Sequence, residues 1–215
     1  GFDSMINFGL KFTAQQDYES IFARYDHILH GELKDYSVLN YISSHDDDKP
    51  LDPARKKNFE AANKLLLAPG AAQIYYGDET ARSLVQPQAQ GDAVLRSMMN
   101  WEDIKTQEST QNILTHWQKL GLFRKNHPAI GAGIHTQISS TPYIFSREYS
   151  SNHYTDKVVV GLDLPLGEKE IIVGTNFAEG SLVNDAYSGK IYRVQNGKVT
   201  LNTPYQIVLL EKNNK

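Results

Sequence analysis

The chain has 215 residues, a formal net charge of −3 and a composition that is 40% hydrophobic, which is typical of a globular protein with one or two buried cores. Lysine and arginine are scattered along the sequence, so the charge pattern argues against a nucleic-acid partner. The absence of cysteine excludes a disulfide framework and thiolate catalysis. No run of 18 apolar residues occurs, so the sequence predicts no membrane span.

The part of the chain up to residue 132 alternates strand-like and helix-like patterns, the order that builds a parallel sheet. Strands are predicted at residues 2–8, 37–42 and 71–76. The spacing of apolar residues predicts a helix that stops at Gly31 and another that ends before His127-Pro128. Asp52-Pro53 is typical of a further helix start, because aspartate caps free amide groups and proline fits the first turn.

From residue 133 onward the pattern changes to short β-like segments separated by Gly, Asn and Asp turns. Asn196-Gly197 lies between two such segments and predicts a hairpin. The spacing is typical of an antiparallel β-sandwich of about eight strands. The sequence therefore predicts two domains, an α/β domain at residues 1–132 and an all-β domain at residues 133–215.

Three strand–helix units are too few for a closed barrel, which needs eight. An open sheet of three parallel strands would leave its edges unpaired and its core face uncovered. We therefore expect the chain to be part of a larger fold, and its start at Gly1, directly before a strand and without a signal peptide, agrees with this. The exposed edge and face are also expected to favour self-association.

Polar residues lie at the C-terminal end of each of the three predicted strands, where a βα-barrel carries its active site. These positions are Asn7, the run from Ser43 to Asp48, and Asp78-Glu79. His45 and Asp46 have the groups needed to bind sugar hydroxyls and to stabilise a developing positive charge. Two alternatives remain open, a solvated turn and a cation site formed by the acidic run that begins at Asp46.

Five segments, in one order along the chain, carry a family resemblance. They are FDSMINF at 2–8, LNYISSHD at 39–46, LLAPGAAQIYYGDE at 66–79, RSMMNW at 96–101, and WQKL with FRKNHPAIG at 117–131. Together they resemble the C-terminal part of the α-amylase superfamily, glycoside hydrolase family 13. The residues of these segments are most similar to those of the periplasmic α-amylases of Gram-negative bacteria. This resemblance implies a periplasmic or secreted protein.

The resemblance implies a fold and an activity. Residues 1–132 would be the last three βα units of a (β/α)8 TIM barrel, and residues 133–215 would be the antiparallel β-sandwich called domain C. The full-length protein would be a retaining hydrolase of the α-1,4-glucosidic bonds of starch or maltodextrin. Ser44 and Gln73 differ from the residues that many family members have there, which leaves the exact specificity open.

The resemblance also assigns roles to single residues. Asp46 would be the catalytic carboxylate that stabilises the transition state, while His45 and Asp47 would bind substrate. The nucleophile, the general acid and the calcium ligands of the family lie on earlier strands. We therefore expect the chain alone to be inactive, we assign no metal ligand in it, and we expect calcium in the full-length protein.

Other candidates have two interpretations. Asp78 and Glu79 either face the sugar or orient Arg82 and its loop, and the second interpretation is favoured. Tyr143, Tyr149 and Tyr154 either form a sugar platform on the β-rich domain or pack against neighbouring strands. A non-catalytic carbohydrate-binding or structural module is therefore the alternative function.

Overall fold

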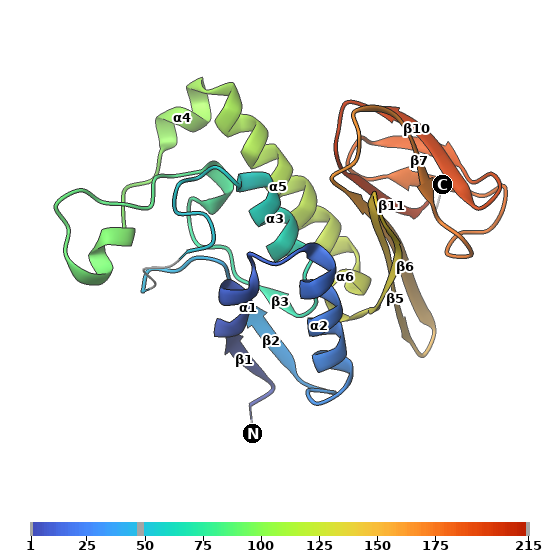
Figure 1. The fold of residues 1–215 in the computed structure, drawn as a ribbon, viewed down its shortest axis with the longest axis horizontal. Helices are drawn as coiled ribbons and strands as arrows, with labels where there is room; N and C mark the ends of the chain where they lie inside the picture. Colours follow the sequence, from blue (N-terminus) through green and yellow to red (C-terminus); the bar gives the residue numbers. More distant parts are fainter. Residues whose placement is uncertain (1, 47–49, 214–215) are drawn as a thin grey trace. The chain divides into compact units, whose positions relative to one another are not determined.

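The computed structural model describes residues 2–46 and 50–213, and the chain divides into two compact units, Gly1–Leu122 and Phe123–Lys215 (Figure 1). The division lies before the predicted domain boundary at residue 132. The reason is that α6 (Pro128–Ala132) packs against β5 (Tyr143–Ser151) and β6 (Tyr154–Leu162). Residues 123–132 therefore belong structurally with the β-rich unit.

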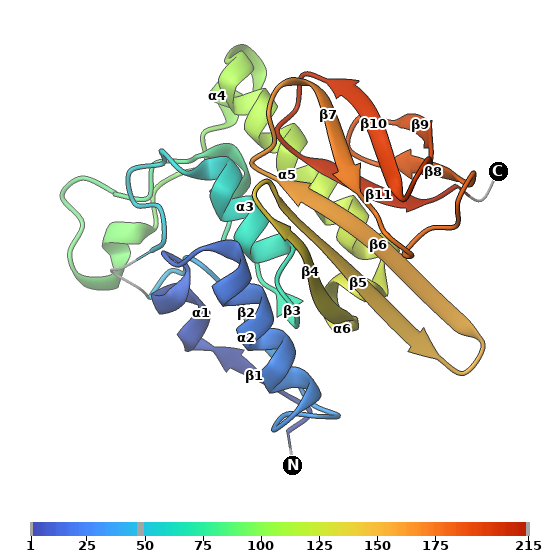
Figure 2. The ribbon, with the colours of Figure 1, turned by 45° about the vertical axis from the view of Figure 1, so that its right-hand side comes forward.

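The first unit combines a parallel sheet with helices. Its elements are β1 (Ser4–Asn7), α1 (Phe8–Thr13), α2 (Tyr18–His30), β2 (Ser37–Asn40), α3 (Asn58–Leu66), β3 (Ala71–Ala72), η1 (Asp78–Thr80), η2 (Gly91–Leu95), α4 (Trp101–Thr106) and the beginning of α5 (Glu108–Asn126). The sheet has the order β1-β2-β3 with all three strands parallel, as the alternating pattern predicted. Helices α1 and α2 lie beside this sheet in both views (Figures 1 and 2).

Helix α2 follows directly from its sequence. The Asp17 side chain accepts a hydrogen bond from the Ser20 amide at 2.8 Å and so caps the first turn. Tyr18, Ile21, Phe22 and Tyr25 recur at helical spacing and are buried. The predicted stop is confirmed, because the helix ends at His30, immediately before Gly31.

Several predicted boundaries in the first unit are wrong, among them the end of the second strand, which lies at Asn40 and not at residue 42. The first strand stops at Asn7, because the Asn7 side chain accepts the Gly9 amide and caps α1. Asp52 accepts the amides of Lys56 and Lys57, so it closes a turn, and α3 begins only at Asn58. The third strand is limited to Ala71–Ala72, so the tyrosines of 71–76 lie in the following loop.

Helix α5 ends at Asn126, before His127-Pro128 as predicted, and one of its sides is buried. Trp117, Leu120 and Phe123 are all less than 5% exposed. The same side also buries His116, whose ring lies 4.7 Å from the Phe59 ring of α3. Burial lowers the pKa of His116 to about 4, so the ring is neutral at pH 7. In the described part of the chain, no helix is both long and apolar enough to cross a membrane.

The second unit is rich in antiparallel strands. After α6 its elements are β4 (Ile134–Ser140), β5, β6, β7 (Gly167–Ile172), β8 (Leu182–Asp185), β9 (Lys190–Arg193), β10 (Lys198–Thr203) and β11 (Val208–Lys212). Among the described residues they form one sheet of order β4-β5-β6-β11-β8-β9 and a separate β10-β7 ladder. Strands β5 and β6 form a long hairpin (Figure 2).

One hydrophobic core joins the two sheets of this unit. Its side chains come from both sheets and their connections: Ile144, Val159, Leu164, Ile171, Val173, Phe177, Val183, Val194, Val199, Leu201, Val208 and Leu210. The six-stranded sheet and the β10-β7 ladder therefore bury their apolar faces against a shared interior, which is how a two-layered β structure becomes stable.

The predicted turn at Asn196-Gly197 is present, but its role differs from the prediction. Both residues have positive φ, 54° and 69°, and Gln195 and Lys198 exchange backbone hydrogen bonds across the turn. The flanking strands then separate, because β9 pairs with β8 whereas β10 pairs with β7. The turn is thus a corner between two sheets.

Gly70, which precedes β3, offers a test of the close approach between β2 and β3. Its φ is +95°, and a Cβ there would lie 2.7 Å from Val38 Cγ2 and 3.0 Å from the Val38 carbonyl oxygen. Gly70→Ala should lower the free energy of unfolding by about 2–3 kcal/mol, because it adds backbone strain to a steric clash. Urea denaturation followed by circular dichroism measures the change.

Gly121→Ala is the matched control, since Gly121 lies within α5 and a Cβ there would meet no atom within 4 Å. Alanine should raise the free energy of unfolding by roughly 0.5–1 kcal/mol at this helical position. Equal effects of the two substitutions would contradict the proposed constraint at Gly70.

Candidate active site

The ends of the parallel strands lie at one edge of the sheet. Asn7 stands opposite Asn40, and Asn40 stands opposite Ala72 in the strand register. Asn7 Nδ2 donates to Asn40 Oδ1 at 2.7 Å, and Asn40 Nδ2 donates to the Pro69 carbonyl at 2.7 Å. Because both amides are engaged in these contacts, the predicted position at Asn7 serves to hold strand ends together.

A buried carboxylate lies beneath the loops that leave β2 and β3. The Asp78 side chain is 1% exposed and forms an ion pair with Arg55, with 2.8 Å between Nη1 and Oδ1. Ser43, in the loop after β2, donates its hydroxyl to the other oxygen of Asp78. Burial raises the pKa of Asp78, and the charge of Arg55 and the Ser43 hydrogen bond partly offset that rise.

Arg82 extends this network to the long loop that ends at Ser97. Its carbonyl accepts a hydrogen bond from Arg55 Nε at 2.7 Å. Its guanidinium donates to the Tyr76 carbonyl at 3.0 Å and to the Ser97 carbonyl at 3.0 Å. The guanidinium carbon also lies 3.9 Å from the centre of the Tyr76 ring. Arg82 therefore fixes both ends of the loop.

The favoured structural interpretation of Asp78 and Glu79 agrees with these contacts. Asp78 contacts Ser43 and Arg55, and Glu79 Oε2 accepts the Gly77 amide at 2.9 Å. The prediction named Arg82 as the residue that Asp78 would orient, whereas the direct ion-pair partner is Arg55. Both carboxylates shape the loop after β3.

His45 and Asp46 lie exposed above this network. Their side chains are 56% and 61% exposed, and His45 Nε2 lies 3.0 Å from Asp46 Oδ1. Arg96 contributes a guanidinium nitrogen 3.3 Å from the same Asp46 oxygen. The His45 ring also lies 6.5 Å from the ring of Tyr75. Two loops thus meet at one exposed carboxylate, and a third brings the Tyr75 ring near His45.

This arrangement has a definite chemical capacity. The accessible Asp46 carboxylate accepts hydrogen bonds from hydroxyl groups and stabilises nearby positive charge. The imidazole and guanidinium beside it can bind hydroxyl or anionic oxygens. Asp47, the other predicted substrate-binding residue, lies outside the described residues.

Sequence reasoning missed part of this site. Arg96 belongs to the RSMMNW segment, but its contact with Asp46 bridges 50 positions and leaves no local pattern. Arg55 was missed for the same reason, because its ion-pair partner Asp78 lies 23 positions away. Within residues 2–46 and 50–213, no group of three histidine, aspartate or glutamate side chains is placed to hold a metal ion. The cation interpretation of the acidic run stays open, because Asp47 and Asp48 are not among those residues.

Comparison with known proteins decides the family. The periplasmic α-amylase of Escherichia coli is 39% identical over 164 residues, a match that covers 74% of this chain and 23% of that protein. The chain belongs to the α-amylase superfamily. It corresponds to the superfamily's C-terminal region. No protein-family model matches the chain.

Solved structures of α-amylase relatives share the fold. An α-amylase from Geobacillus thermoleovorans, complexed with acarbose, aligns with a TM-score of 0.66 at 16% identity over 100% of this chain and 49% of its own. A cyclomaltodextrin glucanotransferase with a three-domain ABC distribution aligns with a TM-score of 0.62 at 23% identity, over 96% of this chain and 44% of its own. The present chain therefore spans about half of the length of each of these two proteins.

The three tyrosines proposed as a sugar platform do not gather in one place. Tyr149 and Tyr154 have ring centres 6.4 Å apart, whereas Tyr143 packs 5.7 Å from the ring of Phe145. Tyr143 and Tyr149 are six residues apart on β5, a separation of roughly 20 Å along a strand. Only the pair near the β5–β6 turn remains a candidate platform.

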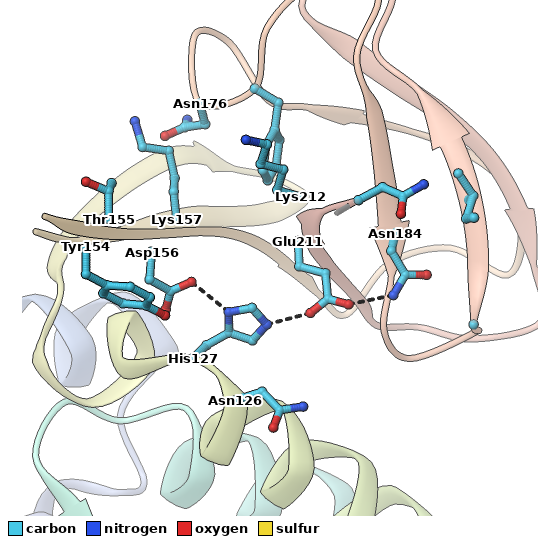
Figure 3. Close-up of a pocket in the computed structure, with 14 residues that line it drawn as sticks. Asn126, His127, Tyr154, Thr155, Asp156, Lys157, Asn176, Asn184, Glu211 and Lys212 are labelled. Carbon is cyan, nitrogen blue, oxygen red and sulfur yellow. Dashed lines mark hydrogen bonds and ion pairs between the residues drawn. The ribbon is translucent and has the colours of Figure 1, made fainter. Parts of the chain in front are cut away.

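A second polar cluster lies in the β-rich unit, around His127 (Figure 3). It was not predicted from the sequence. His127 Nδ1 lies 2.8 Å from Asp156 Oδ1, and His127 Nε2 lies 2.5 Å from Glu211 Oε2. The second oxygen of Asp156 accepts the Ala129 amide, and Asn184 donates to Glu211. The sequence shows only His127 before Pro128, since its partners lie 29 and 84 positions away.

The two carboxylates determine the charge of His127. Burial alone would lower the pKa of the imidazole, but the hydrogen bonds and charges of Glu211 and Asp156 outweigh it and raise that pKa. His127 in turn lowers the pKa of Glu211, together with Asn184. The cluster is therefore an ion triad that ties the start of α6 to β6 and β11.

This triad predicts a pH-dependent stability. A raised histidine pKa gives stability that is fully present below about pH 6.5 and lost as pH rises through the folded-state pKa. A lowered glutamate pKa gives stability that is present above about pH 4.5 and lost as pH falls. His127→Gln should cost about 2 kcal/mol of unfolding free energy near pH 5.5 and clearly less near pH 8.5. Urea denaturation at both pH values measures the difference.

His153→Gln is the control, because His153 is exposed in the β5–β6 turn. Its substitution should change the free energy of unfolding by less than about 0.5 kcal/mol at either pH. A loss in His127→Gln that is the same at pH 5.5 and 8.5 would show that the imidazole charge contributes nothing.

Proposed function

We propose that this chain is the C-terminal part of a retaining α-glucan hydrolase of the α-amylase type, acting on the α-1,4-glucosidic bonds of starch or maltodextrin. The observation that carries the proposal is the exposed Asp46 carboxylate, held beside His45 and Arg96 where the parallel strands end. The sequence match to a periplasmic α-amylase supports it. A carboxylate in this position stabilises the positive charge that develops on the sugar ring.

The proposal gives each site residue a role. Asp46 is the transition-state stabiliser, His45 hydrogen-bonds the sugar in the central subsite, and Asp47 contributes to substrate binding. Residues 1–132 are the last three βα units of a (β/α)8 barrel, and residues 133–215 are domain C. A longer protein then supplies the nucleophile and the general acid, which accords with a chain that spans 23% of its curated relative.

Cofactor and location follow the same proposal. Calcium is assigned to the longer protein, with ligands outside this chain. The protein is assigned to the periplasm or to the secreted fraction, supported by the name of the curated relative. Its partner is an α-glucan oligosaccharide or starch.

Substitution of Asp46 tests the catalytic role in the longer protein. Asp46→Asn keeps the shape of the side chain but removes its charge, so kcat on starch should fall by at least about a hundredfold. The free energy of unfolding should change little, because the carboxylate is 61% exposed. A reducing-sugar assay measures the turnover, and urea denaturation measures the stability.

Asp35→Asn is the matched control, since Asp35 is exposed and asparagine tolerates its positive φ of 74°. It should leave kcat unchanged. The 215-residue chain alone should release no reducing sugar. Near-normal turnover of Asp46→Asn, or hydrolysis by the chain alone, would contradict the roles proposed above.

The proposed barrel fragment also has a physical consequence. Apolar side chains of β1 and α1 are strongly exposed, among them Met5 at 58%, Ile6 at 54% and Phe8 at 63%. We expect the chain to self-associate through this surface, because exposed apolar patches and unpaired strand edges attract further copies. Met5→Lys combined with Ile6→Lys should shift the mass from light scattering toward that of a monomer.

Leu166→Lys is the control for this prediction, since Leu166 is 64% exposed but belongs to the β-rich unit. It should leave the association unchanged. A chain that is monomeric at millimolar concentration without any substitution would contradict the prediction.

A further inference from the structure

The β-rich unit contains a pocket of about 890 Å³ beside the His127 triad (Figure 3). It opens where two strands separate, because the pairing of β6 with β11 ends at Val158 and Glu211. Residues before Val158 on β6 and after Glu211 on β11 line the pocket. The volume lies within the range of roughly 300–1,000 Å³ that small-molecule sites occupy.

The charges around this pocket are arranged in pairs. Asp156 and Glu211 are both engaged by His127, and Lys157 forms an ion pair with Glu148 at 2.7 Å. Lys212 adds an exposed ammonium group on the far side from His127 (Figure 3). Because both signs are present and largely paired, the pocket has no strong preference for an anion or a cation.

The uncharged groups of the lining point to one ligand chemistry. Asn126, Asn176 and Asn184 provide amides that both donate and accept hydrogen bonds, and Thr155 adds a hydroxyl. Tyr154 is 50% exposed and provides an aromatic ring with a polar tip at the pocket wall. Ile191, 51% exposed, contributes an apolar surface. Hydroxyl groups carried on an apolar ring match this combination.

We propose that this pocket binds a segment of a neutral oligosaccharide at a site built entirely from residues of the second unit. The Tyr154 ring packs against a sugar face, while Asn184 and Glu211 bind its hydroxyls. The choice of an α-glucan as the sugar rests on the function proposed above. The site holds polysaccharide without cleaving it.

Titration calorimetry with maltoheptaose tests the site in the 215-residue chain. The chain carries Asp46→Ala, so that binding at the candidate active site is weakened. Saturable heat is expected, and Tyr154→Ala should weaken the affinity about tenfold, as loss of an aromatic contact does. Asn184→Ala should weaken it as well. Tyr154 is half exposed, so its substitution leaves the fold intact.

Tyr36→Ala and Asn202→Ala are the matched controls, since both side chains are exposed and lie outside the pocket lining. Neither should change the affinity. Absence of saturable binding, or equal affinity in Tyr154→Ala, Asn184→Ala and the controls, would overturn the proposal. Inorganic phosphate serves as an anion probe, and phosphate binding tighter than maltoheptaose binding at these residues would also overturn it.

The outcome separates this site from the proposed function. If the longer protein hydrolyses starch but the pocket substitutions leave the affinity unchanged, the pocket proposal fails and the proposed function stands. If the pocket substitutions weaken maltoheptaose binding while the longer protein shows no hydrolysis, the pocket proposal is supported and the proposed function fails.

Discussion

The candidate active site depends on one buried ion pair, between Asp78 and Arg55. A buried carboxylate is costly unless it is paired, and removal of either partner would cost roughly 3–5 kcal/mol. Because Ser43 also donates to Asp78, the loop after β2 is held to the loop after β3. Arg55 also donates a hydrogen bond to the Arg82 carbonyl, and the Arg82 guanidinium in turn donates to the Ser97 carbonyl. This network thus fixes the loops that carry the exposed side chains of His45, Asp46 and Arg96.

The β-rich unit uses charge in a comparable way. His127 is bracketed by carboxylates from two strands that pair only farther along their length. The triad keeps the start of α6 on these strands at the place where their ladder ends. In each unit, hydrogen-bonded charges join segments that are distant in sequence, and the apolar core packs around them. Such networks determine which loops meet.

Local pattern was sufficient for much of the fold. Helix α2 follows from its apolar spacing and its Asp17 cap, and the change after residue 132 marks the β-rich strands. The errors arose where side chains bond their own backbone. Asn7 caps a helix that cuts the first strand short, and Asp52 closes a turn in place of a helix start. At Asn196-Gly197 the predicted turn is present, but the strands on either side of it pair with β8 and β7 instead of with each other.

The site was predictable to a different degree. His45 and Asp46 were named as candidates because they follow a strand within a segment that resembles a known family. Arg96, Arg55 and the His127 triad were missed, because each acts through residues 23 to 84 positions away. Only the three-dimensional fold brings such groups together, and a single sequence carries no record of those contacts.

The bonds of Arg82 to Ser97 have an evolutionary consequence. They hold together the two ends of the loop between these residues. Two further hydrogen bonds do the same: the Tyr75 hydroxyl donates to the Leu95 carbonyl at 3.0 Å, and the Tyr76 hydroxyl donates to the Ser97 carbonyl at 2.9 Å. Closure entropy rises only slowly with loop length. Insertions at the tip, around residues 86–91, can therefore accumulate while Arg96 stays in place. The rim of the candidate site is free to diversify without disturbing the Asp46 carboxylate beside it.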